Sequence, residues 1–294
     1  MSFQSLADME FHKNLVCSVE AERGGGKSAF GVFSVVSRPP VYIQRSDFAS
    51  EGVLVDAKKV GFEDQILVEN YVLDEVREMV EEIDTVAIAK SDSDSAKQHK
   101  RRKQEEIADT VKSAATEVFA QFSEDYDKAL ESGGTVVWDT ASEVYVLVRL
   151  AILGRIKQIP AIYYDKVNKT MDSMINKAVF NPAGTSLVML HKLKDEWLKD
   201  DEGKNGRTGR MERAGYPDVE YPAHAMVRLY NKGGRSDPDR LPRSPHPVPQ
   251  IPGEWHMRIL KCNAKGELVG KDYLIDDQMM GFTILGQEIY GEDW

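Results

Sequence analysis

The chain is expected to fold as an α/β domain with a largely parallel central sheet, because strand-like and helix-like segments alternate along it. Apolar runs with strand character lie at residues 14–20, 41–47 and 133–139. A run of glycines joins the first of these to a stretch with helical propensity that begins at Lys27. Strand, glycine loop and helix in this order are typical of α/β proteins that bind phosphate groups.

The N-terminal third is expected to contain two strands and two helices. "NLVCSVE" at residues 14–20 predicts a short buried strand, and the helix after the glycines covers residues 27–36. "SRPP" ends that helix, because the residue before a proline disfavours helical backbone. "VYIQRSD" at residues 41–47 predicts the second strand. Residues 73–83 are expected to be helical, since apolar residues recur at helical spacing at Val76, Val80 and Ile83.

The composition changes at Ser91, where a polar and charged stretch is followed by an amphipathic one. The apolar residues of this stretch fall on one helical stripe, at Ile107, Val111, Ala114 or Ala115, Val118 and Phe122. We therefore expect residues 85–132 to form a helical hairpin or arm inserted between residues 1–84 and 133–294 of the core. Two interpretations stay open: a plain surface helix pair, or a contact surface for DNA or a neighbouring subunit.

The C-terminal half continues the alternation of strands and helices. Helices are expected at residues 142–154 and 165–179, and strands at residues 133–142, 184–191, 223–231 and 255–275, the last of these a hairpin about Asn263 to Gly266. The proline-dense stretch at residues 231–254 is expected to be a loop. No internal repeat is evident.

Length, charge and cysteine content limit the class of protein. The 294 residues suffice for one large domain, and a hydrophobic fraction of 41% suits a packed core. The formal net charge of −10 does not favour nucleic-acid binding over the whole surface, although local basic stretches can meet phosphates. Cys17 and Cys262 are far apart, which suits a reducing compartment. Without a bilayer-length apolar stretch or a signal-peptide pattern, we expect a cytoplasmic protein with no membrane partner, in the host cytoplasm if it is viral.

The glycine run matches the phosphate-binding P-loop pattern G-x-x-x-x-G-K-[ST] at residues 21–28, with Ala21 in place of the first glycine. In this pattern backbone N–H groups point at phosphate oxygens, the lysine reaches the outer phosphates and the hydroxyl ligates Mg²⁺. The plainer alternative is a glycine-rich turn followed by a lysine at the start of a helix. The sequence predicts an ATP site formed by Ala21, Glu22, Arg23, Gly24, Gly25, Gly26, Lys27, Ser28 and Ala29.

A magnesium ligand is expected at Asp139, which ends the strand-like run "TVVWD". An acid on a separate strand can hold the Mg²⁺ of a bound nucleotide. Any buried strand can end in aspartate, so this assignment depends on the glycine loop. We expect Ser28 and Asp139 to hold Mg²⁺ beside ATP, with Lys27 and Asp139 taking part in catalysis.

Hydrolysis also requires a group that orients the attacking water. Thr140 follows Asp139, so the acidic pair used by many motor ATPases is absent. The water-orienting acid must then come from elsewhere, and the candidates are Asp47, Glu22 and Glu51. Asp47 follows the second expected strand, where a helix cap or a turn residue is an equally good interpretation.

His191 ends the strand expected at residues 184–191. In open α/β sheets ligands gather at the carboxyl ends of the strands. A polar side chain there can sense the terminal phosphate and pass its presence to the next loop. We therefore expect His191 to take part in catalysis; the alternative is a loop histidine without a special role.

The order of the glycine loop, "VVWDT", the helix "DKVNKTMDSMINKAV" and "GTSLVMLHKLKDEW" resembles the phage RecA-like ATPases of single-strand annealing and recombination. The likeness covers residues 12–50 and 133–235. It implies a RecA-like P-loop core, DNA-stimulated ATP hydrolysis with Mg²⁺, and single-stranded DNA as partner. It also implies a ring or filament with ATP sites between subunits, and a single-strand-binding protein as a candidate partner. The second expected strand lacks the D-x-E ending that this family has there, which leaves the catalytic acid unassigned. Residues 51–132 do not match the family.

In that family the strand that ends in histidine is followed by lysines and a DNA-facing loop. The resemblance implies that Lys192 and Lys194, which alternate along an extended segment, reach a neighbour's terminal phosphate. The alternative is a solvated pair. The stretch "KDDEGKNGRTGRMERAG" is then the DNA-facing loop, with phosphate contacts from Lys204, Arg207, Arg210 and Arg213. Trp197 and Tyr216 are the nearest aromatic candidates for stacking.

Three other functions stay open from the sequence. "ERGGGKS" also resembles the glycine loop of phage terminase large subunits, which suggests a DNA-packaging or helicase-type motor. The missing acidic pair and the short chain count against that motor. An ATP-dependent assembly or adaptor protein without DNA activity would suit the acidic net charge. A small-molecule kinase would use the arginines at residues 207–213 as a lid.

Overall fold

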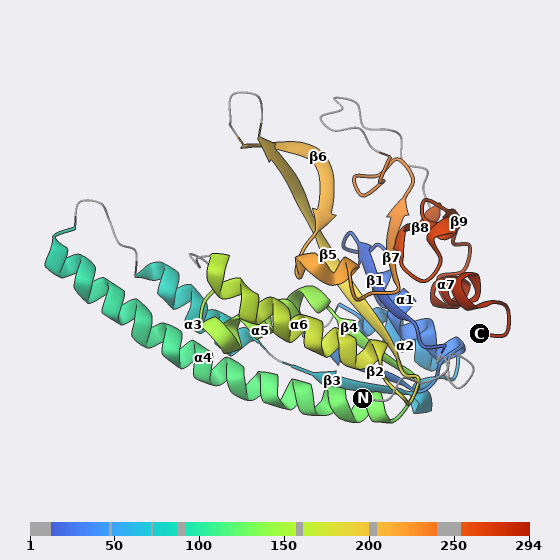
Figure 1. Ribbon diagram of the computed structural model, residues 1–294, viewed down its shortest axis with the longest axis horizontal. Coiled ribbons are helices and arrows are strands. Elements are labelled where there is room, and N and C mark those ends of the chain that lie inside the picture. The colour runs from blue at the N-terminus through green and yellow to red at the C-terminus, as the bar shows by residue number, and fades with distance from the viewer. Residues whose placement is uncertain are drawn as a thin grey trace, which may run out of the picture.

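The computed structural model describes residues 13–46, 49–71, 73–86, 92–156, 161–199, 205–239 and 254–294. Among these residues, nine strands form one sheet in the order β3-β2-β4-β5-β1-β7-β8-β9, with β6 paired to β5 outside this path (Figure 1). The strands are β1 (Val16–Ala21), β2 (Val41–Arg45), β3 (Ile66–Asn70), β4 (Thr135–Asp139), β5 (Ser186–Lys199), β6 (Asn205–Arg213), β7 (Ala225–Asn231), β8 (Trp255–Cys262) and β9 (Asp272–Leu274).

Helices cover the sheet and connect its strands (Figure 1). The α-helices are α1 (Lys27–Val32), α2 (Glu51–Lys59), α3 (Asp74–Thr85), α4 (Asp94–Glu131), α5 (Ala141–Leu153), α6 (Tyr164–Val179) and α7 (Gly281–Tyr290). Short 3₁₀ helices lie at Phe33–Val36, Glu63–Gln65, Ala161–Tyr163, Pro217–Glu220 and Gly266–Leu268. None of the described helices is both long and apolar enough to cross a membrane.

The six strands from β3 to β7 in the sheet order are parallel, and β8 and β9 extend the sheet in antiparallel fashion beyond β7. The predicted α/β fold with a largely parallel sheet is confirmed. Every residue of β1 and β4 is buried, which explains their continuous apolar signal. β5 lies between these two strands: its Leu190 pairs with Val19 of β1 and with Asp139 of β4. The carboxyl ends of β1 and β4 therefore meet at one edge of the sheet.

The two faces of the sheet carry different helices. Side chains of α3, α4, α5 and α6 pack on one face around Trp138. Side chains of α1, α2 and α7 pack on the other face. Gly31 lets α1 approach β4 closely, because a Cβ at this position would lie 2.7 Å from Cγ1 of Val137. The glycine loop that precedes α1 is thereby held directly above the ends of β1 and β4.

Residues 94–131 of the expected helical hairpin or arm form α4, a single helix of 38 residues, so the expectation of a hairpin or helix pair there is wrong. The Ser93 hydroxyl caps its start and accepts a hydrogen bond from the N–H of Ala96 at 3.3 Å. The predicted apolar stripe is confirmed, since its residues are buried or packed against the core. The rings of Phe122 and Tyr126 lie 6.0 and 5.2 Å from that of Trp138. The C-terminal half of α4 thus belongs to the main core, while α3 packs against α4 nearer its start (Figure 1).

β5 and β6 form a hairpin that extends away from the rest of the sheet (Figure 1). The prediction that the strand ends at His191 is wrong, because β5 continues to Lys199. The prediction of a loop is also wrong for residues 205–213, which form β6. Both stretches are rich in charged residues, so they lack the apolar alternation that marks a half-buried strand. The sequence analysis also missed α2, β3 and α7.

Candidate phosphate-binding site

The glycine loop connects the end of β1 to the start of α1. Gly24 and Gly26 adopt the left-handed backbone conformation, with φ of 77° and 78°, which residues with a Cβ rarely adopt. The N–H of Gly25 donates to the carbonyl oxygen of Glu22 at 3.0 Å. A Cβ at Gly25 would lie 2.8 Å from the Cβ of Ala21. The shape of the loop therefore requires all three glycines.

Lys27 and Ser28 begin α1 and lie beside the end of β4. The Nζ of Lys27 donates to the carbonyl oxygen of Glu22 at 3.3 Å. The Oγ of Ser28 donates to Oδ2 of Asp139 at 3.3 Å, and Asp139 is only 1% exposed. The structure thus brings together the lysine, the hydroxyl and the acid that the sequence analysis assigned to one site. Of the remaining predicted loop residues, Arg23 is exposed and Ala29 is buried beneath the loop.

A pocket of about 650 Å³ lies against the loop at the carboxyl edge of the sheet. We call it the phosphate pocket. Three cationic side chains and one carboxylate line it, which suits an anion that also carries a metal ion. Its lining residues are Ala21, Arg23, Lys27, Ala49, Asp139, Thr140, Lys192 and Leu193.

The side chains at the pocket fit Mg²⁺. Ser28 and Asp139 supply a hydroxyl and a carboxylate oxygen, the hard ligands that Mg²⁺ prefers. In the described part of the chain, no group of three or more His, Cys, Asp or Glu side chains could hold a metal ion. Proteins commonly bind Mg²⁺ through one or two carboxylates, with substrate phosphates and water completing the shell. The pair therefore suits Mg²⁺ that arrives with a phosphate ligand.

Glu143 is a polar residue of this region that the sequence analysis missed. It lies in the first turn of α5, and its side chain is 12% exposed. Oε1 accepts a hydrogen bond from the Nζ of Lys192 at 2.7 Å, and Oε2 pairs with the guanidinium of Arg77 on α3. Lys192 also lines the phosphate pocket. One carboxylate thus connects the pocket to two helices on one face of the sheet.

The three acids that the sequence analysis proposed for water activation are differently placed. Asp47 lies outside the described residues. Glu51 pairs with Arg45 at 2.7 Å. Glu22 is half-buried in the glycine loop, where its backbone carbonyl is the acceptor for Lys27. The geometry places neither Glu22 nor Glu51 among the lining residues of the phosphate pocket.

His191 is buried and lies outside the lining of the phosphate pocket. Its Nδ1 is 3.3 Å from the carbonyl oxygen of Ala214, which also accepts a hydrogen bond from Ser142 on α5. Burial lowers the pKa of His191 to about 3, and the charge of Arg213 acts in the same direction. Side chains alternate across a strand, so the next residue, Lys192, lines the pocket. In this geometry Lys192, and not His191, lines the pocket.

The burial of His191 predicts a loss of stability in acid. The unfolded chain binds a proton on this ring near pH 6.5, whereas the folded chain binds it only near pH 3. The free energy of unfolding therefore falls as the pH drops from 6.5 toward 3, by on the order of 2 kcal/mol at about pH 5. Urea unfolding of the wild type and of His191→Gln at about pH 7.5 and about pH 5 measures this. An equally steep pH dependence in the variant would assign the acid sensitivity to another group.

Lys194, expected at a neighbour's terminal phosphate, and Arg207, expected at DNA, are both exposed on the hairpin of β5 and β6. Lys194 pairs with Glu212 across the hairpin at 3.2 Å. The guanidinium of Arg207 lies 5.2 Å from the ring centroid of Trp197. Both side chains of this stacked pair are more than half exposed, Arg207 at 66% and Trp197 at 53%. The hairpin therefore presents an aromatic ring and a cation to solvent.

The other residues of the predicted DNA-binding set are placed differently. Arg213 lies at the base of the hairpin and donates to the carbonyl oxygen of Pro217 at 2.7 Å. Burial lowers the pKa of its guanidinium. Arg210 is half-buried on β6, and Lys204 lies outside the described residues. Arg207 is therefore the best placed of the described arginines for a ligand on the hairpin.

Comparison with known proteins adds no family assignment to this geometry. No protein-family model matches the chain, and a search of curated proteins finds no significant match. The case for a function therefore depends on the loop, the acid at the end of β4 and the hairpin.

Proposed function

We propose that the chain is a Mg²⁺-dependent P-loop ATPase with a RecA-like core that acts on single-stranded DNA. The observation that carries the nucleotide part is the 3.3 Å contact between Oγ of Ser28 and Oδ2 of Asp139 beside the glycine loop. These residues are 111 positions apart in the sequence. A glycine turn that merely starts a helix would not require this convergence, so the contact supports a phosphate-binding loop.

In the proposed site the phosphates of ATP occupy the phosphate pocket. Lys27 turns from the Glu22 carbonyl to the outer phosphates, while Ser28 and Asp139 hold the metal. Bound Mg²⁺ supplies positive charge against the charge of the transferred group. Lys192 approaches the terminal phosphate from β5. Each of these side chains lines the pocket or contacts one that does.

Glu143 is the acid that we assign to the attacking water. Its carboxylate pairs with Lys192, which lines the pocket, and with Arg77 of α3. The oriented water attacks the terminal phosphorus, and the bond to the bridging oxygen breaks. ADP leaves with that oxygen, and the proton of the water passes through the carboxylate to solvent. Asp47 stays the alternative acid for this step.

The hairpin supports the DNA part of the proposal. An exposed aromatic ring stacks on bases, and a cation beside it can meet phosphates or stack in turn. Trp197 and Arg207 provide this pair. β5 also carries Lys192 of the phosphate pocket. A ligand on the hairpin could thus displace Lys192, which would make hydrolysis depend on DNA.

The direct test is the rate of ATP hydrolysis with and without single-stranded DNA at two salt concentrations. We expect DNA to raise the rate, and the effect to fade at higher salt because phosphate contacts release counterions. Stimulation only by double-stranded DNA, with translocation, would favour a packaging or helicase-type motor. Hydrolysis that responds to neither nucleic acid would favour an assembly or adaptor protein.

The hairpin pair gives a specific prediction. The double variant Trp197→Ala, Arg207→Ala should weaken single-stranded DNA binding about tenfold, since one stacked base contributes about 1–3 kcal/mol. Fluorescence anisotropy of a labelled oligonucleotide measures this. A control is Tyr221→Ala, Lys261→Ala, which removes another cation–aromatic pair, an exposed tyrosine with a half-buried lysine whose ammonium lies 5.0 Å from the ring centroid. Equal DNA affinity in both variants would remove the hairpin from the proposal.

Assembly into a ring or filament stays a prediction that rests on the resemblance to the phage RecA-like ATPases. Particle images with ATP and DNA would test it. A monomer under these conditions would exclude ATP sites between subunits, and with them a role for Lys194 at a neighbour's phosphate.

A further inference from the structure

A second pocket lies against the glycine loop, on the side of β1 opposite the phosphate pocket. The phosphate pocket takes its lining from β4 and β5, which lie on one side of β1 in the sheet. The second pocket takes its lining from β7 and β8, on the other side of β1. Gly25 and Gly26 of the loop line it directly. The loop therefore separates two pockets of different character.

The walls of the second pocket are mostly apolar. The buried side chain of Phe30, on α1, is one of its lining residues. Leu229 of β7, Trp255 of β8 and Ile275 also line it. The exposed Gln278 brings an amide to the rim. Such a mixture of an aromatic ring, aliphatic side chains and one amide suits a flat aromatic ligand with a polar edge.

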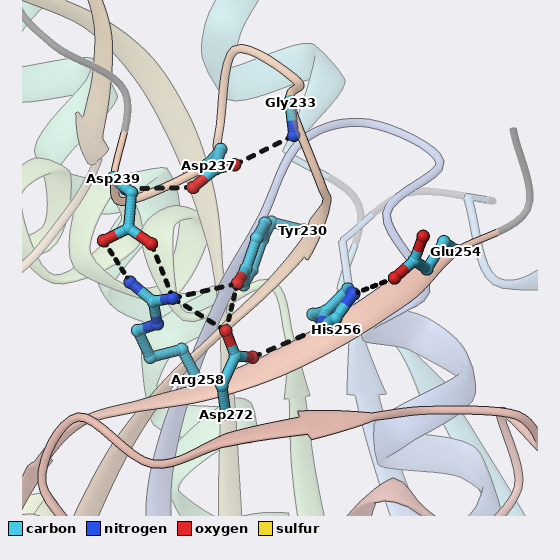
Figure 2. Close-up of polar contacts among 8 residues, drawn as sticks. All are labelled: Tyr230, Gly233, Asp237, Asp239, Glu254, His256, Arg258 and Asp272. Carbon is cyan, nitrogen blue, oxygen red and sulfur yellow. Dashed lines mark hydrogen bonds and ion pairs between the residues drawn. The ribbon is translucent and has the colours of Figure 1, made fainter. Parts of the chain in front are cut away.

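His256 also lines this pocket, but its ring nitrogens are engaged elsewhere. Nε2 lies 3.0 Å from a carboxylate oxygen of Glu254, and Nδ1 lies 3.4 Å from one of Asp272. The ring stacks on Tyr230 at a centroid distance of 5.4 Å. Figure 2 shows His256 between the two acids. The histidine is therefore positioned to offer the pocket its ring surface and not a free hydrogen-bonding nitrogen.

The same polar network fixes the neighbouring strands. Arg258 pairs with Asp239 through both terminal nitrogens, at 2.5 and 2.7 Å, and with Asp272 at 2.7 Å (Figure 2). The Tyr230 hydroxyl donates to the same carboxylate of Asp272. The loop after β7 is thus tied to β8 and β9. The network therefore fixes how β7, β8 and β9 lie beside the pocket.

We propose that the second pocket binds the nucleobase of the nucleotide whose phosphates occupy the phosphate pocket. This inference rests on the proposed function. The triphosphate crosses the glycine loop, with its terminal phosphate toward Asp139 and Lys192 and its base toward Trp255. Contact of the base with the apolar walls supplies most of its binding free energy. Gln278 is the one polar side chain that we assign to the edge of the base.

The size of the pocket determines how the base enters. The open space between its walls is about 20 Å³, against about 650 Å³ for the phosphate pocket. A base is larger than this space and enters by displacing side chains at the rim. Trp255 is half-buried and Gln278 is exposed, so these are the two that move. Because binding depends mainly on the contact area of the base, and a purine has the larger ring surface, purine nucleotides should bind more tightly than pyrimidine nucleotides.

The test compares binding of ATP, UTP and inorganic tripolyphosphate, each with Mg²⁺, to the wild type and to Trp255→Ala. We expect the variant to bind ATP about tenfold more weakly, the change expected for the loss of one base–aromatic contact. Its affinity for tripolyphosphate should not change. Leu274→Ala, on the exposed side of β9, is the matched control and should bind both ligands as the wild type does.

A second variant keeps the test decisive if Trp255→Ala fails to fold. Trp255→Phe retains an aromatic ring, so it should bind ATP within about threefold of the wild type. It should lose the change in tryptophan fluorescence that ATP, but not tripolyphosphate, causes in the wild type. Persistence of that change in the phenylalanine variant would place the base elsewhere.

The outcomes separate this inference from the proposed function. ATP and tripolyphosphate affinities that fall together, or not at all, in Trp255→Ala would overturn the base site and leave an ATPase possible. UTP binding as tight as ATP binding would also contradict it. If the wild type binds neither ATP nor tripolyphosphate, the phosphate site itself fails and the base site fails with it.

Discussion

Lys27→Ala is expected to weaken binding of ATP with Mg²⁺ by about a hundredfold, the effect of losing two charge-assisted hydrogen bonds at the lower end of their range. Lys27 lines the phosphate pocket, and its ammonium lies within the loop, 3.3 Å from the carbonyl oxygen of Glu22. In the proposed complex it donates to the outer phosphates. Isothermal titration with a non-hydrolysable ATP analogue measures the affinity directly.

The fold should tolerate this substitution. Lys27 is not among the buried core residues, and a partly exposed hydrogen bond of this kind contributes only about 1 kcal/mol to stability. Lys58→Ala, on the exposed surface of α2, removes one positive charge far from the loop glycines in the sequence and serves as control. If Lys27→Ala keeps the affinity of the wild type, Lys27 does not contact phosphate and the P-loop interpretation is lost.

The parallel sheet and the glycine loop could be predicted because their signals are local. β1 and β4 are buried along their whole length, so apolar runs mark them without reference to the rest of the chain. The glycines are needed for backbone conformations that a side chain would strain, and their spacing is visible in the sequence. Periodicity also identified the stripe of α4, because a long amphipathic helix repeats its pattern many times.

Local signals could not predict the hairpin of β5 and β6, or the role of Glu143 beside Lys192. Among the described residues, the outer half of β5 pairs only with β6, and it carries charged residues. Its strand character therefore comes from pairing with β6 and not from an apolar face. Glu143 stands 66 positions from Arg77 and 49 from Lys192. Only the folded chain brings these two cations to one carboxylate. The sequence analysis considered the residue directly after Asp139 and did not consider an acid one helical turn later.

The distinction between His191 and Lys192 has a similar cause. Their order in the sequence is plain, but the face of the sheet to which each points depends on the register of β5 between β1 and β4. A shift of one residue exchanges the two faces of a strand. With the observed register the neutral histidine is buried beside the Ala214 carbonyl and the lysine lines the phosphate pocket.

Glu143→Gln is expected to lower kcat for ATP hydrolysis by about a hundredfold or more, since it removes a group that can take a proton from water. The amide has nearly the same shape and can still accept a hydrogen bond from Lys192. Affinity for ATP should therefore stay within about threefold of the wild type. Steady-state kinetics and titration with the analogue measure the two effects separately. Glu117→Gln, on the exposed face of α4, is the matched control.

The results for Glu143→Gln distinguish a chemical role of Glu143 from a merely structural one. Loss of the carboxylate charge leaves Lys192 and Arg77 without their common anion at a site that is only 12% exposed, so some loss of stability is expected in either case. A structural role alone would lower binding and turnover together and shift the thermal midpoint. A chemical role lowers kcat in a protein that still binds ATP. If Glu143→Gln hydrolyses ATP at the wild-type rate while Asp47→Asn does not, the water-orienting acid is Asp47, and Glu143 serves only to hold Lys192 beside the pocket.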